Sequence, residues 1–303
     1  MTSFLGWQFQ PLRLSDQAVI EPFLTAHPQK LADYTFAVLA AWQPAFAYEW
    51  SMPEPETLVI SCTLMPGGER HLLQPVGKCP SEILKQIVKQ SQTLSYAFHI
   101  LSVGEPCLTA HPRLEEFFKI HAIRDGDNYI YRASDLATLE GRAYVRKRNL
   151  VSQAARLTPW STEPVSPRNL TACLDVLTQI EHDEPHEPHR LLEQEIAALK
   201  FTLENFAKLH QRGILVRVAE RPVAFALYET LGPDTAAVHF ERALRAYKGL
   251  YQVINKETAR TIVAEGLTLI NREEDIGDEG LRKAKLSYSP IRLEPCFWLE
   301  LRR

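Results

Sequence analysis

The sequence predicts an α/β protein with two successive halves, each built on a mixed β-sheet. Three observations favour this fold class. The chain has 303 residues, which is enough for two domains of ordinary size. Short apolar segments with the period of a strand alternate with longer segments that have the period of a helix. The order of these segments in the first half returns in the second half.

The first half contains the element order βααβββαβαβ. Ser15 provides an N-cap for its first helix, and Pro80-Ser81 opens its third helix. The predicted strands are Gln8–Leu14, Ala45–Ser51, Thr57–Leu64, Arg70–Val76, Phe98–Val103 and Asn128–Ala133. The predicted helices are Ser15–Leu24, Asp33–Trp42, Ser81–Tyr96 and Arg113–Lys119.

The second half repeats this order, although the two halves share negligible sequence identity. The tight turn Glu220-Arg221-Pro222 separates two of its strands. The predicted strands are Trp160–Val165, Ile214–Ala219, Val223–Thr230, Thr235–Ala243, Leu267–Asn271 and Cys296–Leu301. The predicted helices are Asn169–Glu181, Leu191–His210, Leu250–Glu265 and Gly280–Tyr288.

A basic segment lies between the halves. We expect an N-terminal domain at residues 1–138, a connecting helix at 139–157 and a C-terminal domain at 158–303 that carries the candidate active site. Arg146, Lys147 and Arg148 are concentrated in the connecting helix, and prolines follow it.

The composition is typical of a globular protein. With 45% hydrophobic and 23% charged residues, both halves can bury a core, and a net charge of −3 argues against a globally basic nucleic-acid coat. The sequence has no apolar run of about 18 residues and no basic, apolar signal segment at its start, so we expect a cytoplasmic protein without an integral membrane segment. The scattered cysteines favour neither disulfides nor a zinc site.

The repeated element order is that of the acetyltransferase-like (GNAT-like) fold. In that fold a mixed sheet splits between its fourth and fifth strands, and the donor enters where the diverging strands leave backbone groups unpaired. In the second half these strands are Thr235–Ala243 and Leu267–Asn271.

Three groups of residues carry a family resemblance. They are Asp127–Arg132 with Tyr144–Asn149, Phe240–Arg242 with Tyr247–Tyr251, and Asn271–Asp275 with Gly280–Tyr288. Together they resemble an uncharacterised bacterial family related to the C-terminal catalytic domain of phosphatidylglycerol lysyltransferase. Asp33–Phe36 and Trp42 fit the same family. A more distant similarity is to the Fem-type peptidoglycan aminoacyltransferases, which have two acetyltransferase-like halves and a basic helix between them.

The resemblance implies transfer of an aminoacyl group from charged tRNA to an amine or hydroxyl acceptor, with no other cofactor. Two alternatives remain open. One is a non-catalytic protein with a degenerate cleft that binds a small molecule or nucleic acid. The other is an acyl-CoA N-acetyltransferase. Against the latter, the turn Arg245–Leu250 has an extra residue before Gly249, and Leu250 and Tyr251 stand where a second small residue is needed beside a pyrophosphate. Arg245, Tyr247 and Gly249 are nevertheless candidate donor-binding residues, because a helix N-terminus attracts anions.

The strand Thr235–Ala243 supplies the candidate base. His239 and Glu241 alternate onto one face, and either can accept a proton from the acceptor. Glu241 is preferred because Arg242 and Arg245 are near it in sequence. Lys248 and Arg272 are candidates to stabilise negative charge on the attacked carbonyl oxygen. The alternative for Glu241 is an ion pair at the end of a strand.

Other polar residues are predicted to bind the donor or the acceptor. The set comprises Arg242, Asn271, Arg282 and Lys285, with Arg146, Lys147 and Arg148 on the connecting helix as contacts for nucleic-acid phosphates. Solvated helix faces are the alternative for the basic residues. His182, His186 and His189 have a spacing reminiscent of a metal site, but Pro185 and Pro188 interrupt any helix there, so no metal is expected.

Overall fold

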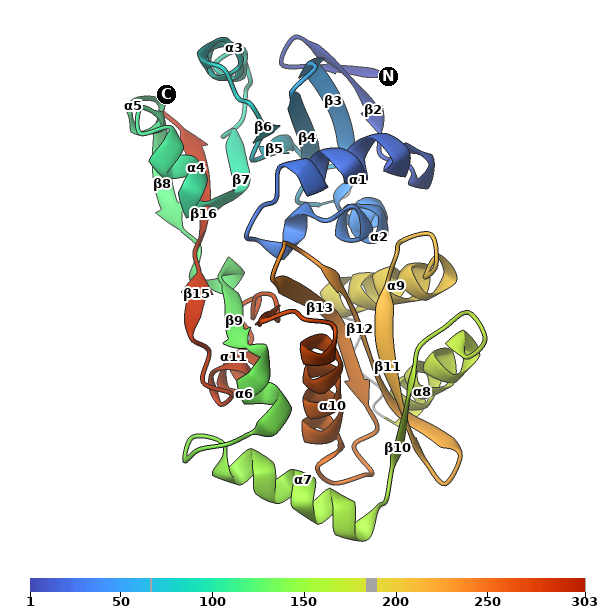
Figure 1. Ribbon diagram of the computed structural model, residues 1–303. Helices are drawn as coiled ribbons and strands as arrows, with labels where there is room; N and C mark the ends of the chain where they lie inside the picture. Colours follow the sequence, from blue (N-terminus) through green and yellow to red (C-terminus); the bar gives the residue numbers. More distant parts are fainter. Residues whose placement is uncertain (66, 184–189, 303) are drawn as a thin grey trace. The chain divides into compact units, whose positions relative to one another are not determined.

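The computed structural model describes residues 1–65, 67–183 and 190–302, and the chain divides into two compact units (Figure 1). The first unit contains Met1–Asn128 and Glu294–Arg303, and the second contains Tyr129–Leu293. Each unit has its own mixed sheet with helices packed on it, which confirms the predicted α/β fold with tandem acetyltransferase-like halves. His186 and His189, considered above for a metal site, lie outside the described residues.

The first unit is organised around a sheet with the strand order β1-β2-β3-β4-β5-β7-β16-β8, in which β6 also pairs with β4. Strand β4 is buried along its whole length, as its nearly continuous apolar sequence predicts. The strands are β1 Thr2–Phe4, β2 Trp7–Pro11, β3 Glu49–Glu54, β4 Thr57–Thr63, β5 Arg70–Leu73, β6 Val76–Gly77, β7 His99–Gly104, β8 Phe118–Ala122 and β16 Cys296–Leu301. The helices are α1 Gln17–Ala26, α2 Phe36–Phe46, α3 Ser81–Ser91, α4 Glu105–Ala110 and α5 Leu114–Phe117.

The second unit is organised around a sheet with the strand order β10-β11-β12-β13-β14-β9-β15. Helix α10 packs against β11, β12 and β13, while α8 packs against β12 and β13. The strands are β9 Asn128–Arg132, β10 Ser161–Pro164, β11 Arg212–Val218, β12 Arg221–Thr230, β13 Thr235–Ala243, β14 Leu269–Asn271 and β15 Arg292–Glu294. The helices are α6 Ala133–Thr138, α7 Val145–Leu157, α8 Leu170–Asp183, α9 Arg190–Glu204, α10 Leu250–Ala264 and α11 Glu279–Leu286.

One strand from each half of the sequence pairs in the sheet of the other half, so the boundaries of the two units differ from the domain boundaries expected from the sequence. Strand β9, expected in the N-terminal domain, pairs antiparallel with β14 in the second sheet. Strand β16, expected in the C-terminal domain, pairs with β7 and β8 in the first sheet. The sequence pattern that identifies a strand is local and does not specify the sheet it joins. A division of the chain at residues 138 and 158 therefore misplaces one strand of each unit.

The connecting segment also differs from the expected helix over 139–157. Helix α6 ends at Thr138, and Leu139 and Gly141 follow it with positive φ angles of 56° and 85°. A right-handed helix cannot continue through such angles, so α7 begins only at Val145. Similarly, the predicted helix Arg113–Lys119 is a short α5 that turns into strand β8 at Phe118.

None of the described helices is long and apolar enough to cross a membrane. The five cysteines are all free thiols, with Cys62, Cys173 and Cys296 buried and Cys79 and Cys107 half-buried.

Candidate functional site

The second sheet splits between β13 and β14. The two strands pair in parallel at Thr235↔Leu269, Ala236↔Ile270 and Ala237↔Asn271. Strand β14 ends there, while β13 continues to Ala243, paired on its other side with β12. The second half of β13 therefore faces the segment that follows β14. Side chains from these two segments meet across the split.

Glu241 is the centre of a buried polar cluster at this split. Its Oε1 accepts a hydrogen bond from Arg272 Nη2 at 3.2 Å, and its Oε2 accepts one from Asn255 Nδ2 of α10 at 3.3 Å. The side chains of Glu241 and Arg272 are only 12% and 14% exposed. We call Glu241, Asn255 and Arg272 the Glu241 cluster. Strand β13, helix α10 and the loop after β14 each contribute one of its members.

Arg272 is held as a cation between aromatic rings. Its guanidinium carbon lies 5.2 Å from the ring centre of Tyr288 and 5.8 Å from that of Tyr131. Burial alone would lower its pKa, but the Glu241 carboxylate and the two tyrosines outweigh burial and raise the pKa. Its backbone N–H donates to Tyr129 O of β9 at 3.0 Å, which fixes the start of the loop. The strand exchanged into this sheet thus supports the cluster directly.

The cluster contains buried polar atoms that are not satisfied by the protein. Among the described residues, Arg272 Nη1 and Asn255 Oδ1 have no hydrogen-bond partner. The same holds for Oγ1 of Thr258, which lies three residues beyond Asn255 on the buried face of α10. Buried polar atoms without a partner are costly, so each such atom in a native protein calls for a bound molecule or a functional role. Arg272 and Asn255 thus provide one such donor and one such acceptor on side chains that contact the Glu241 carboxylate.

Lys285 and Arg282 hold the loop after β14 in place. Lys285 Nζ donates to Arg272 O at 2.6 Å and also to Glu274 O, and burial lowers the pKa of this ammonium group. Arg282 forms two hydrogen bonds with the Asp275 carboxylate, at 2.9 Å and 2.7 Å. Burial alone would raise the pKa of Asp275, but Arg282 and Tyr129 hold it well below its usual range. Both basic residues therefore position the loop that carries Arg272.

Asn271 has a related local role. Its Oδ1 accepts the backbone N–H of Glu273 at 2.7 Å, and its side chain is fully buried. This bond turns the chain at the end of β14 and aims Arg272 toward Glu241.

Arg242 and Lys248 do not join the Glu241 cluster, although we expected both there. Arg242 Nη2 pairs with Glu195 Oε1 of α9 at 2.6 Å, whereas Glu241 contacts α10. Successive residues of a strand point to opposite faces, so these neighbours face different helices. Lys248 is exposed in the turn before α10, and so is Arg245, while Tyr247 is half-buried there.

Gly249 is required for packing. Its φ is +86°, and a Cβ at this position would lie 2.6 Å from Leu150 O of α7. The backbone N–H groups of Leu250 and Gln252 donate to Tyr247 O and Gly249 O. Helix α7 thus occupies space beside the α10 N-terminus. Some of the backbone N–H groups at that terminus already donate hydrogen bonds within the protein.

We expect this turn to bind CoA weakly or not at all. A pyrophosphate needs free N–H groups and close approach to the backbone, and both are reduced here. Isothermal titration calorimetry with acetyl-CoA measures this directly. A dissociation constant in the micromolar range would contradict the expectation and favour an acyl-CoA N-acetyltransferase.

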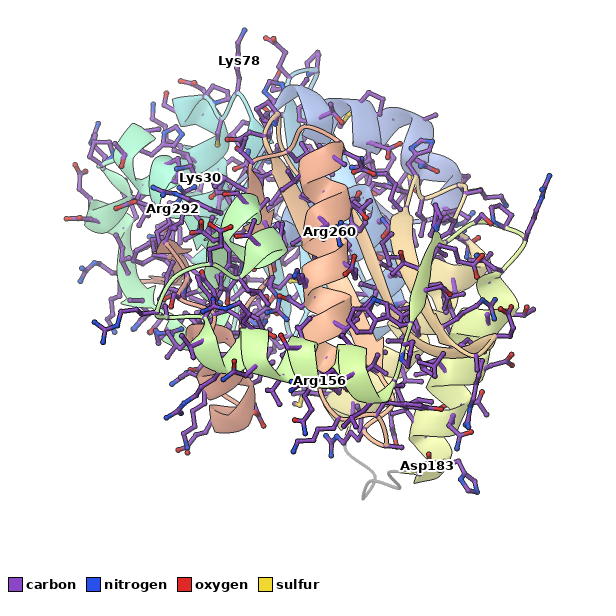
Figure 2. The ribbon with its side chains drawn as sticks, turned by 60° about the horizontal axis from the view of Figure 1, so that its bottom comes forward. Lys30, Lys78, Arg156, Asp183, Arg260 and Arg292 are labelled. Carbon is purple, nitrogen blue, oxygen red and sulfur yellow. The ribbon has the colours of Figure 1, made fainter. Side chains whose placement is uncertain are left out.

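The basic residues of α7 have different surroundings. Lys147 Nζ lies 4.2 Å from the ring centre of Tyr288, and burial together with Arg272 lowers its pKa. Arg148 donates to the carbonyl groups of Leu139 and Gly141. Arg146 is exposed, as is Arg156 further along α7, which is labelled in Figure 2. Of the three predicted phosphate contacts, Arg146 is exposed while Lys147 and Arg148 are half-buried, because adjacent helix residues point in different directions.

His239 is a buried cation, which makes it unsuitable as a base. Its Nδ1 lies 2.6 Å from Glu273 Oε1 and its Nε2 lies 2.7 Å from Glu229 Oε1. Burial alone would lower its pKa, but hydrogen bonds to the two carboxylates raise the pKa to about 10. An imidazolium that donates through both nitrogens has no lone pair with which to accept a proton. Between the two residues considered, Glu241 remains the candidate base.

Sequence reasoning missed Asn255 as a member of the cluster, Tyr131 and Tyr288 as neighbours of Arg272, and Thr258 as a buried polar residue on the same helix as Asn255. A signal was present for two of them. Asn255 and Thr258 are polar residues at positions of α10 where the helical period calls for buried apolar ones. Tyr131 and Tyr288 lie in segments that carry the family resemblance, but their proximity to Arg272 depends on the pairing of β9 with β14 and on the position of α11.

Comparison with known proteins identifies the family of the chain. The family model described as "Phosphatidylglycerol lysyltransferase, C-terminal" matches residues 26–300. The chain belongs to this family. The family's model thus includes both units, with the split that carries the Glu241 cluster. Among curated proteins, none matches the sequence.

Several solved structures resemble this chain over nearly its whole length. A conserved protein of unknown function from Bacteroides thetaiotaomicron is 29% identical, with a TM-score of 0.86 over 97% of this chain and 99% of the other. L-PGS from Bacillus licheniformis is 12% identical, with a TM-score of 0.65 over 94% and 91%. FemX is 10% identical, with a TM-score of 0.61 over 96% and 97%. The last two likenesses show the fold alone, and they agree with the predicted relation to Fem-type proteins.

Proposed function

We propose that the second unit transfers an aminoacyl group from aminoacyl-tRNA to an amine or hydroxyl acceptor. The family membership supports the reaction class, since its description names a lysyltransferase. The main structural support is the buried Glu241–Arg272 pair, in which one guanidinium nitrogen has no partner in the described chain. Such a pair places an acceptor of protons beside a donor of hydrogen bonds in a poorly hydrated environment. Both groups are required in acyl transfer.

The reaction assigns a role to each member of the cluster. The acceptor nitrogen or oxygen attacks the ester carbonyl carbon of the donor, and its proton passes to the Glu241 carboxylate. Negative charge then develops on the carbonyl oxygen, where Arg272 Nη1 donates a hydrogen bond. The bond between this carbon and the ribose oxygen breaks, and the ribose oxygen takes up the proton that Glu241 received. Asn255 orients Glu241 through its amide group and presents Oδ1 to the bound substrate.

The proposed reaction is tested by deacylation of individual charged tRNAs. Each of a panel of radiolabelled aminoacyl-tRNAs is incubated with the protein and a mixture of amine and hydroxyl acceptors, including phosphatidylglycerol vesicles. Acceleration of deacylation with recovery of label in an acceptor supports aminoacyl transfer. A protein that binds charged tRNA but transfers no label to any acceptor would instead be a non-catalytic binder.

The donor can be tested separately through Arg146. If Arg146 contacts a tRNA phosphate, Arg146→Gln should reduce the slope of log affinity against log salt by about 1. Fluorescence anisotropy with labelled tRNA at several KCl concentrations measures the slope. Arg260→Gln is the matched control, because Arg260 is exposed on α10 and pairs with Glu257. Equal slopes for wild type and Arg146→Gln would remove Arg146 from the interface.

A further inference from the structure

The first unit contains a cavity of about 190 Å³. It lies beside the carboxyl ends of the parallel strands β5 and β7, with α3 and α4 around it. Its apolar lining includes Leu84, Ile100, Val103, Leu114 and Leu299. Ile100, Val103, Leu114 and Leu299 are buried, and Leu84 of α3 is half-buried.

The cavity occupies the place where the first sheet splits. Strands β5 and β7 pair in parallel at Leu72↔Ile100 and Leu73↔Leu101. Beyond these residues the side chain of Gln74 bridges the gap. Its Oε1 accepts the backbone N–H of Gly104 at 2.9 Å, and its Nε2 donates to Gln29 Oε1 at 2.7 Å. The side-chain amides of Gln74 and Gln29 at this end of the cavity are therefore held by hydrogen bonds within the protein.

The lining contains one imidazole, that of His111, and otherwise only uncharged side chains. Among the described residues that line the cavity there is no aspartate, glutamate, lysine or arginine. Burial raises the pKa of Cys79 to about 12 and that of Cys107 to about 11, so both lining thiols are neutral at pH 7. Neutral thiols behave as small apolar groups. The split in the second sheet is different, because charged side chains fill it.

We propose that this cavity in the first unit binds an uncharged apolar group of about six carbons, such as a short alkyl chain or the end of an acyl chain. The size argument comes from engineered cavities, since an apolar cavity of about 150 Å³ accommodates benzene. The charge argument comes from the lining, because a charged group placed there would lose its hydration, and no aspartate, glutamate, lysine or arginine among the described lining residues is present to pair with it. This binding does not require that the second unit carry out aminoacyl transfer.

The lining thiols provide a local measurement of occupancy. We would follow alkylation of Cys79 and Cys107 by iodoacetamide with peptide mass spectrometry, in the presence of n-alcohols from butanol to decanol. A bound chain should slow alkylation of both thiols in a saturable manner. Affinity should rise about fourfold for each added methylene until the chain fills the cavity, and then level off. Protection that does not saturate, or that is independent of chain length, would overturn the proposal.

Two variants on α3 test the location. Leu84→Trp should fill the cavity and abolish protection by hexanol, while the matched control Lys85→Trp should retain it, because Lys85 is 74% exposed. A melting curve for each variant reports whether the first unit remains folded. Equal protection of wild type and folded Leu84→Trp would contradict the assignment. If Leu84→Trp does not fold, the chain-length series in the wild-type protein decides.

Discussion

Glu241→Gln should lower the rate of aminoacyl transfer by ~10²–10⁴-fold, which is the usual contribution of a general base. Glutamine preserves the shape of the side chain and a carbonyl oxygen that can accept the hydrogen bond from Asn255. It cannot accept a proton from the attacking group. The expected loss therefore falls on turnover, with a much smaller change in KM, because the donor and acceptor still bind.

The control must separate loss of the base from loss of the fold. Glu279→Gln removes the same charge from a side chain that is 84% exposed, and it should leave turnover within twofold of wild type. Glu241→Asp retains the carboxylate but withdraws it by one methylene, so partial activity is expected. Wild-type turnover in Glu241→Gln, with an unchanged melting temperature, would mean that the Glu241–Arg272 pair is only a structural ion pair.

The local elements were predictable because their signals are local. Alternation gave Thr235–Ala243 and Cys296–Leu301 with the bounds of β13 and β16. The exchange of β9 and β16 between sheets was not predictable in this way, since their alternation is compatible with either sheet. The cluster depends on that exchange, because Tyr129 and Tyr131 of β9 contact Arg272.

The candidate site shows a similar division. Glu241 and Arg272 were named from sequence and lie in contact, and Lys285 supports their loop. Adjacent residues on a strand point to opposite faces, so the sequence alone already indicates that Arg242 and Glu241 lie on different faces of β13. The direction of the Lys248 side chain could not be predicted in this way, because Lys248 lies in a turn and residues in a turn do not alternate regularly between two faces. Asn255 required knowledge of which helix covers β13.

His239→Gln should destabilise the second unit by ~3–5 kcal/mol, which is the usual cost of removing one partner from a buried ionic network. His239 is 4% exposed and separates the carboxylates of Glu229 and Glu273. Glutamine supplies neither the positive charge nor donors to both sides. Urea-induced unfolding at pH 7 measures the loss. His121→Gln is the matched control, because His121 pairs with Glu300 at an exposed site and should change stability by less than ~1 kcal/mol.

The dependence on pH distinguishes a charged His239 from a neutral one. The pKa of His239 is about 10 in the folded chain against an ordinary value of 6.5, so protonation stabilises the folded state. This contribution is complete below about pH 6.5 and disappears as the pH rises through about 10. The stability difference between wild type and His239→Gln should therefore be large at pH 6 and shrink markedly by pH 10. Adding Glu229→Gln and Glu273→Gln to His239→Gln should recover part of the loss at pH 7, because the uncompensated carboxylates are then removed. A stability difference that stays constant from pH 6 to pH 10 would show that His239 is neutral in the folded protein, and it would reopen the choice between His239 and Glu241 as the base.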